Sequence, residues 1–176
     1  GAGPDTVKGM RLGLPRQFFW DEVDPQVEAA VRQAAQVFAD MGAHVEEVSL
    51  PELDTLVQLR QRGSLTAVES YAYFREWLDT RPDEFDPIIS VRMLAGKDMT
   101  AVDFLALQRA FEDLRRRFHR RMAGFDALLT PTTPFTALPV AQADTDDYSR
   151  SNGLCLRNTS AANQLGLCAL SLPCGF

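Results

Sequence analysis

Hydrophobic and polar positions follow two different periods in the first fifty residues of the chain. Residues 10–15, MRLGLP, form a short apolar run that ends at a proline and predicts a β-strand. Over residues 21–43 apolar side chains recur at intervals of three and four, which predicts a helix with Asp24 as its N-cap, a proline in its first turn and Gly42 beyond its end. Residues 44–51 predict a second strand. This order predicts a βαβ unit with parallel strands, the alternative being two unrelated strands beside a helix.

The middle of the chain is predicted to be helical. Residues 53–78 carry apolar bulk in a helical pattern, with a break expected near Gly63. Residues 79–87, DTRPDEFDP, are acidic and contain two prolines, so they predict a loop. A short helix is predicted over residues 87–96, where a glycine ends the pattern.

The longest predicted helix begins after Thr100. Thr100 and Asp103 have the spacing of a capping box, with Asp in place of the more usual Glu. One face of this helix is apolar and the opposite face is basic. We interpret the basic face as solvated, because cations suit the C-terminal end of a helix dipole; the alternative is a patch for nucleic acid or an anionic membrane. The apolar stripe comprises Phe104, Leu107, Phe111, Leu114, Phe118 and Met122, and the basic face comprises Arg109, Arg115, Arg116, Arg117, Arg120 and Arg121.

Strand and helix patterns also alternate in the last third. Residues 125–134, FDALLTPTTP, predict a strand covered on both faces that runs into a Pro/Thr turn. Residues 141–152 are polar and predict a loop, residues 159–165 predict a short helix before a turn at a glycine, and residues 168–172 predict a closing strand. The fold class is therefore α/β, a mixed, largely parallel β-sheet covered by helices, in a single α/β unit over residues 1–176.

Composition and charge exclude several functions. The net charge of −6 argues against nucleic acid as a partner, because phosphate binding depends on clustered Lys and Arg. Apolar runs stay well short of the ~20 residues that span a bilayer, so we expect no membrane partner and take the cytoplasm as the default location. Three cysteines, Cys155, Cys168 and Cys174, include no CxxC pair, which disfavours a zinc site. Motifs for cofactor binding are missing as well, and no cofactor is expected.

Residue types alone do not assemble a complete catalytic centre. Several serines occur, but a serine nucleophile needs an adjacent base. Neither histidine lies in a motif that would supply one, and the only lysines are Lys8 and Lys97, whose surroundings predict no desolvation. Glu69 and Asp86 could form a carboxylate pair, although their spacing does not require it.

Four stretches in the same order resemble the C-terminal half of amidase signature enzymes. They are KGMRLGLPRQFF with GAHVEEVSLPE, the middle stretch RPDEFDPIISVRMLAGKDMTAVDF, FDALLTPTTP, and the closing NQLGLCALSLPCGF. The closing pattern of the family is Asn-x-x-Gly-x-Pro-x-x-Ser-x-Pro-x-Gly. Cys168 stands where the family usually has proline, and the residues that fit are Asn163, Gly166, Ser171, Pro173 and Gly175.

The resemblance implies hydrolysis of a carbon–nitrogen amide bond by a serine nucleophile, a second serine on a cis peptide and a lysine base. In the family these three residues lie in a Gly/Ser-rich region of the N-terminal half, and this sequence contains no such run. The resemblance therefore implies that the chain is the C-terminal portion of a bacterial amidase domain, without catalytic residues of its own and inactive alone. It would supply sheet scaffold and one wall of the pocket for a small amide substrate.

The same resemblance suggests five substrate-binding residues. Arg92, in RMLAG, lies close to the position of a substrate-anchoring arginine in the related A subunit of the amidotransferases; the alternative is a helix-end arginine that binds carbonyl groups. Tyr71 would line the same wall, or pack in the core. Thr132 and Thr133 would face the site, or serve only the turn. Asn163 would hold backbone near the loop of the nucleophile.

Two other functions remain open. One is part of the A subunit of a glutamine-dependent tRNA amidotransferase, although the Ser-Asn-Leu-Ala-Arg stretch usual in that protein is not found where AVESYAYF stands. The other is a non-catalytic α/β binding module. A sheet that lacks neighbouring strands would expose an edge and apolar surface, so we also expect association into a homodimer.

Overall fold

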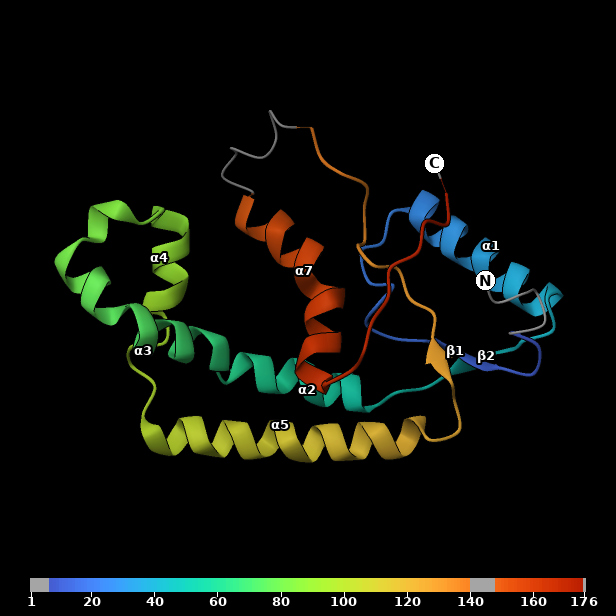
Figure 1. Ribbon diagram of the computed structural model, residues 1–176, viewed down its shortest axis with the longest axis horizontal. Helices are drawn as coiled ribbons and strands as arrows, with labels where there is room; N and C mark the ends of the chain where they lie inside the picture. The colour runs from blue at the N-terminus through green and yellow to red at the C-terminus, as the bar shows by residue number, and fades with distance from the viewer. Residues whose placement is uncertain (1–6, 140–147, 176) are drawn as a thin grey trace. The chain divides into compact units, whose positions relative to one another are not determined.

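A computed structural model describes residues 7–139 and 148–175 of the chain (Figure 1). The chain divides into two compact units. Unit 1 comprises residues 1–53 and 115–176, and unit 2 comprises residues 54–114.

Unit 1 is built on a three-stranded parallel sheet with the order β2-β1-β3 (Figure 1). The central strand β1 (Arg11–Pro15) pairs with β2 (His44–Val48) over its whole length and with β3 (Ala127–Leu128) at two positions. The α/β class and the βαβ unit predicted from the sequence are both confirmed, and every strand pair in the described residues is parallel.

Helix α1 (Pro25–Asp40) connects β1 to β2 and has the predicted ends. The side chain of Asp24 accepts a hydrogen bond from the backbone N–H of Gln26, which caps the helix. Gly42 lies beyond the C-terminus with a φ of 94°, a conformation that glycine adopts without steric cost. Val31 and Ala35 are buried on the predicted apolar face.

Strand β3 is shorter and less covered than predicted. The expected apolar strand spans only Ala127–Leu128, both half-buried, although Leu129 continues the pairing with one backbone hydrogen bond to Gly13. The ladder then stops at Pro131, because proline has no N–H to donate.

Helix α7 (Tyr148–Leu165) begins earlier than predicted. The helix expected over residues 159–165 extends back to residue 148, so the loop prediction is wrong for residues 148–152, while residues 141–147 lie outside the described residues. Tertiary contacts far along the chain hold this extension, including an ion pair of 2.7 Å between Arg150 and Glu22. The predicted turn at Gly166 is confirmed by its φ of 68°.

The predicted closing strand is wrong. Residues 168–172 have no regular secondary structure, and they pair with none of the strands in the part of the chain that the structure describes. Leu170 is 82% exposed and Leu172 is 61% exposed, so the apolar side chains that suggested a buried strand face solvent here. An apolar run becomes a strand only when a neighbouring backbone is available to pair with it.

Unit 2 is helical, and its segments follow the predicted order. Helix α2 (Glu52–Gln61) starts at the end of unit 1, and the break before α3 (Leu65–Thr80) falls at Gly63, whose φ is 140°. The predicted loop after α3 contains the short 3₁₀ helix η2 (Pro82–Glu84). Helix α4 (Pro87–Leu94) then turns back beside α3 (Figure 1). Its N-terminus is capped by Asp86, one member of the suggested carboxylate pair, whose side chain accepts hydrogen bonds from two backbone N–H groups.

Helix α5 (Ala101–Met122) runs from unit 2 into unit 1. Thr100 caps it by accepting from the backbone N–H of Asp103 at 3.1 Å. The return bond of the expected capping box differs, because the Asp103 carboxylate accepts from the Thr100 hydroxyl at 2.6 Å instead of from its backbone. The apolar stripe is confirmed: Leu107, Phe111, Leu114 and Phe118 are buried, and Phe104 and Met122 are half-buried.

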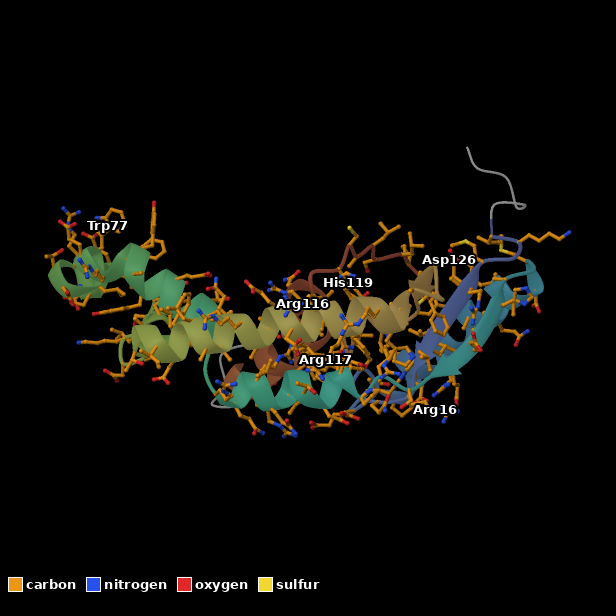
Figure 2. All side chains as sticks on the ribbon, turned by 90° about the horizontal axis from the view of Figure 1, so that it is seen from below. Arg16, Trp77, Arg116, Arg117, His119 and Asp126 are labelled. Carbon is orange, nitrogen blue, oxygen red and sulfur yellow. The ribbon has the colours of Figure 1, made fainter. Side chains whose placement is uncertain are left out.

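The basic face of α5 is only partly a solvated surface. Within unit 1, Arg115 donates to the backbone carbonyl of Gln164 at 2.7 Å, and Arg121 donates to the carboxylate of Glu52 at 2.6 Å. Figure 2 shows Arg116, Arg117 and His119 on the same stretch of helix. Across the described ranges no helix is both long and apolar enough to span a bilayer.

Candidate functional site

The five predicted substrate-binding residues divide between the two units. Thr132, Thr133 and Asn163 belong to unit 1, and Arg92 and Tyr71 belong to unit 2. Thr132 and Thr133 lie in the loop after β3, and Asn163 lies on α7. Arg92 lies on α4 and Tyr71 on α3.

In unit 1 the loops that follow β1 and β3 start at the same edge of the sheet, because parallel strands end on one side. Asp126, hydrogen-bonded to Arg11, marks the amino edge, and Arg16, hydrogen-bonded to Val48, follows the carboxyl edge (Figure 2). A hydrogen bond of 2.7 Å from the Asp24 N–H to the Pro134 carbonyl joins the two loops. Ligands of open α/β sheets bind outside this carboxyl edge.

Two hydroxyl groups meet beside these loops. The side-chain oxygens of Thr132 and Ser171 lie 2.9 Å apart, within hydrogen-bonding distance, and both residues are exposed. We call Thr132 and Ser171 the hydroxyl pair. Each hydroxyl has one donor and two acceptor positions, so the single bond within the pair leaves one donor for a third group such as a substrate carbonyl.

Thr133 and Asn163 form hydrogen bonds only with the nearby backbone in the described residues. The hydroxyl of Thr133 donates to the carbonyl of Phe135 at 2.9 Å, which is the turn role considered as its alternative. Asn163 lies exposed near the end of α7, where its backbone carbonyl accepts from the N–H of Gly166 at 3.1 Å. Their substrate-binding roles stay predictions.

Asn158 is a residue that sequence reasoning missed. It is 3% exposed on α7, and its amide nitrogen donates to the carbonyl of Pro131 at 2.8 Å and to the carbonyl of Phe19 at 3.1 Å. The missed signal is helical spacing: Asn158 shares the face of the fully buried Ala161 and Leu165. A polar side chain on an apolar stripe must find partners, since burying it without hydrogen bonds costs free energy.

The neighbouring Arg157 supports the same loop. Its Nε donates to the Asn158 side-chain oxygen at 3.1 Å, and its guanidinium lies 5.7 Å from the centre of the Phe18 ring. Phe18 is buried with a φ of 66°, a left-handed conformation that costs a non-glycine residue about 1 kcal/mol or more. The loop after β1 is therefore strained and held by contacts from α7.

In unit 2, Tyr71 on α3 and Arg92 in the last turn of α4 are both half-buried. The position of α4 against α3 depends on Gly96. A Cβ atom at Gly96 would lie 2.3 Å from the backbone oxygen of Ala67, so only glycine permits this approach. The setting of Arg92 relative to α3 is therefore fixed by a backbone contact.

The titratable groups do not form a reactive centre within the described residues. Lys8 and Lys97 are both exposed, and neither is hydrogen-bonded to a serine there. Glu69 is exposed on α3. The hydrogen bond and the charge of the buried Glu52 raise the pKa of Arg121 above its ordinary value. In the same residues no group of three or more His, Cys, Asp or Glu side chains could hold a metal ion.

Comparisons with known proteins agree over nearly the whole chain. A family model described as Amidase matches residues 3–176. The chain is 32% identical to the 2-amino-5-chloromuconic acid deaminase of Comamonas testosteroni, with 98% of this chain and 38% of that protein covered. It is 32% identical to an amidase of Pseudomonas putida, with 97% and 37% covered. It is 30% identical to the A subunit of the glutamyl-tRNA(Gln) amidotransferase of Symbiobacterium thermophilum, with 99% and 40% covered.

A solved structure supports the fold. The S177A allophanate hydrolase of Kluyveromyces lactis matches with a TM-score of 0.80 at 18% identity, covering 98% of this chain and 28% of that one. At this identity the likeness shows the fold alone. The chain spans about 38% of the length of the Comamonas testosteroni deaminase.

Proposed function

Because this chain belongs to the amidase signature family, we propose that it is part of an enzyme that hydrolyses a carbon–nitrogen amide bond of a small substrate. In this proposal the chain is the C-terminal portion of the amidase domain. It supplies part of the sheet and one wall of the pocket. The nucleophilic serine, the second serine and the lysine base belong to another part of the longer protein, equivalent to the part of the relatives that this chain does not match. The coverage of 98% of this chain but only 38% of a relative is consistent with a longer enzyme, and the closing pattern around Asn163, Gly166 and Ser171 is what suggests its C-terminal portion.

The observation that carries the proposal is the position of the hydroxyl pair. Thr132 and Ser171 lie 2.9 Å apart beside the loops at the carboxyl edge of a parallel sheet. A free hydroxyl donor at this edge suits the carbonyl oxygen of an amide, whose hydrogen bond would orient the scissile bond toward a nucleophile. We assign the pair to substrate binding and not to chemistry, since neither hydroxyl has a base beside it in the described residues.

Within unit 2, Arg92 and Tyr71 are assigned to substrate binding on their own. A guanidinium can bind a carboxylate through two parallel hydrogen bonds, so Arg92 suits a substrate with an acidic group. Tyr71 offers an aromatic surface beside a polar hydroxyl. Thr133 is assigned to holding the backbone beside Thr132, since its hydroxyl donates to the Phe135 carbonyl, and Asn163 keeps its predicted role near the loop of the nucleophile.

The test uses the longer reading frame that contains these residues, assayed for ammonia release from small amides. Replacing both hydroxyls, as Thr132→Val with Ser171→Ala, should raise KM by about fivefold with a smaller change in kcat, because one hydrogen bond to substrate is worth about 1 kcal/mol. The matched control is Thr159→Ala, which removes a hydroxyl bonded only within its own helix. Absence of amide hydrolysis by the longer protein would overturn the proposal.

A second candidate is the A subunit of a tRNA-dependent amidotransferase, which the relative from Symbiobacterium thermophilum supports. This candidate predicts ammonia release from glutamine in the presence of partner subunits, and little hydrolysis of simple amides by the longer protein alone. The same assay with glutamine and with small amides distinguishes the two.

A further inference from the structure

Asn158 lies where it can control the candidate site without touching substrate. We propose, resting on the proposed function, that Asn158 is a positioning residue that locks the loop after β1 to the loop after β3, so that the hydroxyl pair is held in its binding geometry. We call Asn158 and Arg157 the loop clamp.

The first argument is the complete use of the Asn158 side chain. Its amide nitrogen has two N–H groups, and it donates to one carbonyl in each loop, at Phe19 and at Pro131. Its oxygen accepts from Arg157 Nε, which fixes which end of the amide faces the carbonyls. Binding both carbonyls requires a side chain of this length with two N–H donors on one atom. Aspartate has the same length but cannot replace Asn158, because an ionised carboxylate has no donor.

The second argument is the place of the anchored carbonyls. Pro131 directly precedes Thr132, and both Pro131 and Pro134 are fully buried, so the short segment between them has little freedom once Asn158 binds it. The hydroxyl of Thr132 is then presented to Ser171 from a fixed backbone. Without the clamp the segment becomes ordered only when substrate binds. The free energy needed to order it then weakens substrate binding.

The third argument is the strained loop on the other side of the clamp. Phe18 has a φ of 66°, and Glu22, in the same loop, has a φ of 52°. Two non-glycine residues in the left-handed region persist only where the surroundings hold them. The clamp contacts this loop at both the Phe19 carbonyl and the Phe18 ring. Its loss should therefore release both loops together.

Amide hydrogen exchange on the 176-residue chain tests the coupling directly. In Asn158→Ala and Asn158→Asp, the hydrogen-bonded amides of the loop after β1 (Phe19, Asp21, Val23 and Asp24) and the amide of Leu129 where the loop after β3 begins should exchange at least about tenfold faster than in the unchanged chain. Helix α1 and strand β2 should keep their protection. Thr159→Ala is the control and should leave both loops unchanged. Acceleration of only one loop, or of neither, would contradict the clamp. If the Asn158 variants do not fold, Arg157→Leu should accelerate both loops to a smaller degree, and unchanged exchange in that variant would contradict the clamp as well.

Kinetics of the longer reading frame separates positioning from general destabilisation. Asn158→Ala should raise KM by up to about fivefold, no more than the double hydroxyl variant does, with kcat less affected when both are measured well below the melting temperature. Added to the double hydroxyl variant, Asn158→Ala should raise KM little further, because both changes remove the same contact. Additive effects would overturn the clamp. A longer protein without any amidase activity would instead refute the proposed function, and the exchange result would still decide the clamp.

Discussion

Replacement of Gly96 by alanine tests the packing that sets Arg92. The added Cβ would lie 2.3 Å from the oxygen and 2.4 Å from the carbon of the Ala67 carbonyl, and 2.5 Å from the nitrogen of Val68. All three atoms belong to the backbone of α3, so no side chain can rotate away. Cβ contacts under 3.0 Å essentially never occur, and the end of α4 must therefore shift by about 0.7 Å.

The magnitude follows from two opposing effects. Overpacking of this kind costs about 1–3 kcal/mol, and three backbone atoms in the overlap favour the upper part of that range. Replacing glycine also reduces the conformational freedom of the unfolded chain, which increases the free energy of unfolding by about 0.4–1 kcal/mol. The net loss in unfolding free energy is about 2 kcal/mol, which corresponds to a melting temperature lower by about 4–8 °C for a chain of this size.

Thermal unfolding followed by circular dichroism measures this loss, with Gly153→Ala as the matched control. Gly153 lies in α7, and a Cβ there meets nothing within 4 Å. The control should be more stable than the unchanged chain by about 0.5–1 kcal/mol, as expected for alanine in an exposed helix. A Gly96→Ala chain as stable as the unchanged one would refute the backbone contact between α4 and α3.

Three further predictions concern unit 1. Asp24→Ala removes the bond that caps α1 and should lower the unfolding free energy by about 1 kcal/mol in urea titration; an unchanged midpoint would contradict the cap. Phe118→Ala empties a fully buried position and should cost about 3–5 kcal/mol, seen as a large fall in melting temperature; a fall of only a few degrees would contradict its burial. Glu52 raises the pKa of Arg121 in the folded chain. The stability gained from this ion pair is therefore fully present below the pKa of an unfolded-state arginine and is lost only at still higher pH. The difference in melting temperature between the unchanged chain and Arg121→Met should therefore be equal at pH 7 and pH 10, and a difference that vanishes by pH 10 would contradict this charge pairing.

The elements with local signals were predictable from the sequence. Asp24 with a following proline defined the start of α1, and Gly63 separated α2 from α3, because capping and left-handed backbone depend on residues close in the chain. The apolar stripe of α5 was predictable for the same reason, since its period is a property of the helix itself.

Features that depend on distant partners were missed. The pattern of residues 168–172 suits a strand, but pairing requires a second backbone that a local pattern cannot supply. Asn158 appeared as one polar residue among several, and its role follows from carbonyls of Phe19 and Pro131 far away in the sequence. The contact between Thr132 and Ser171 is equally non-local. The candidate site was therefore located in part by the PTTP turn, while its organisation required the structure.

The central claim is that this chain forms scaffold and pocket wall for amide hydrolysis, with the nucleophile and its base supplied from outside it. The most direct measurement is ammonia release from a panel of small amides by the purified 176-residue chain and, in parallel, by the longer reading frame that contains it. The account predicts no turnover by the 176-residue chain and turnover by the longer protein. Turnover by the 176-residue chain that disappears when one of its own serines is replaced would contradict it.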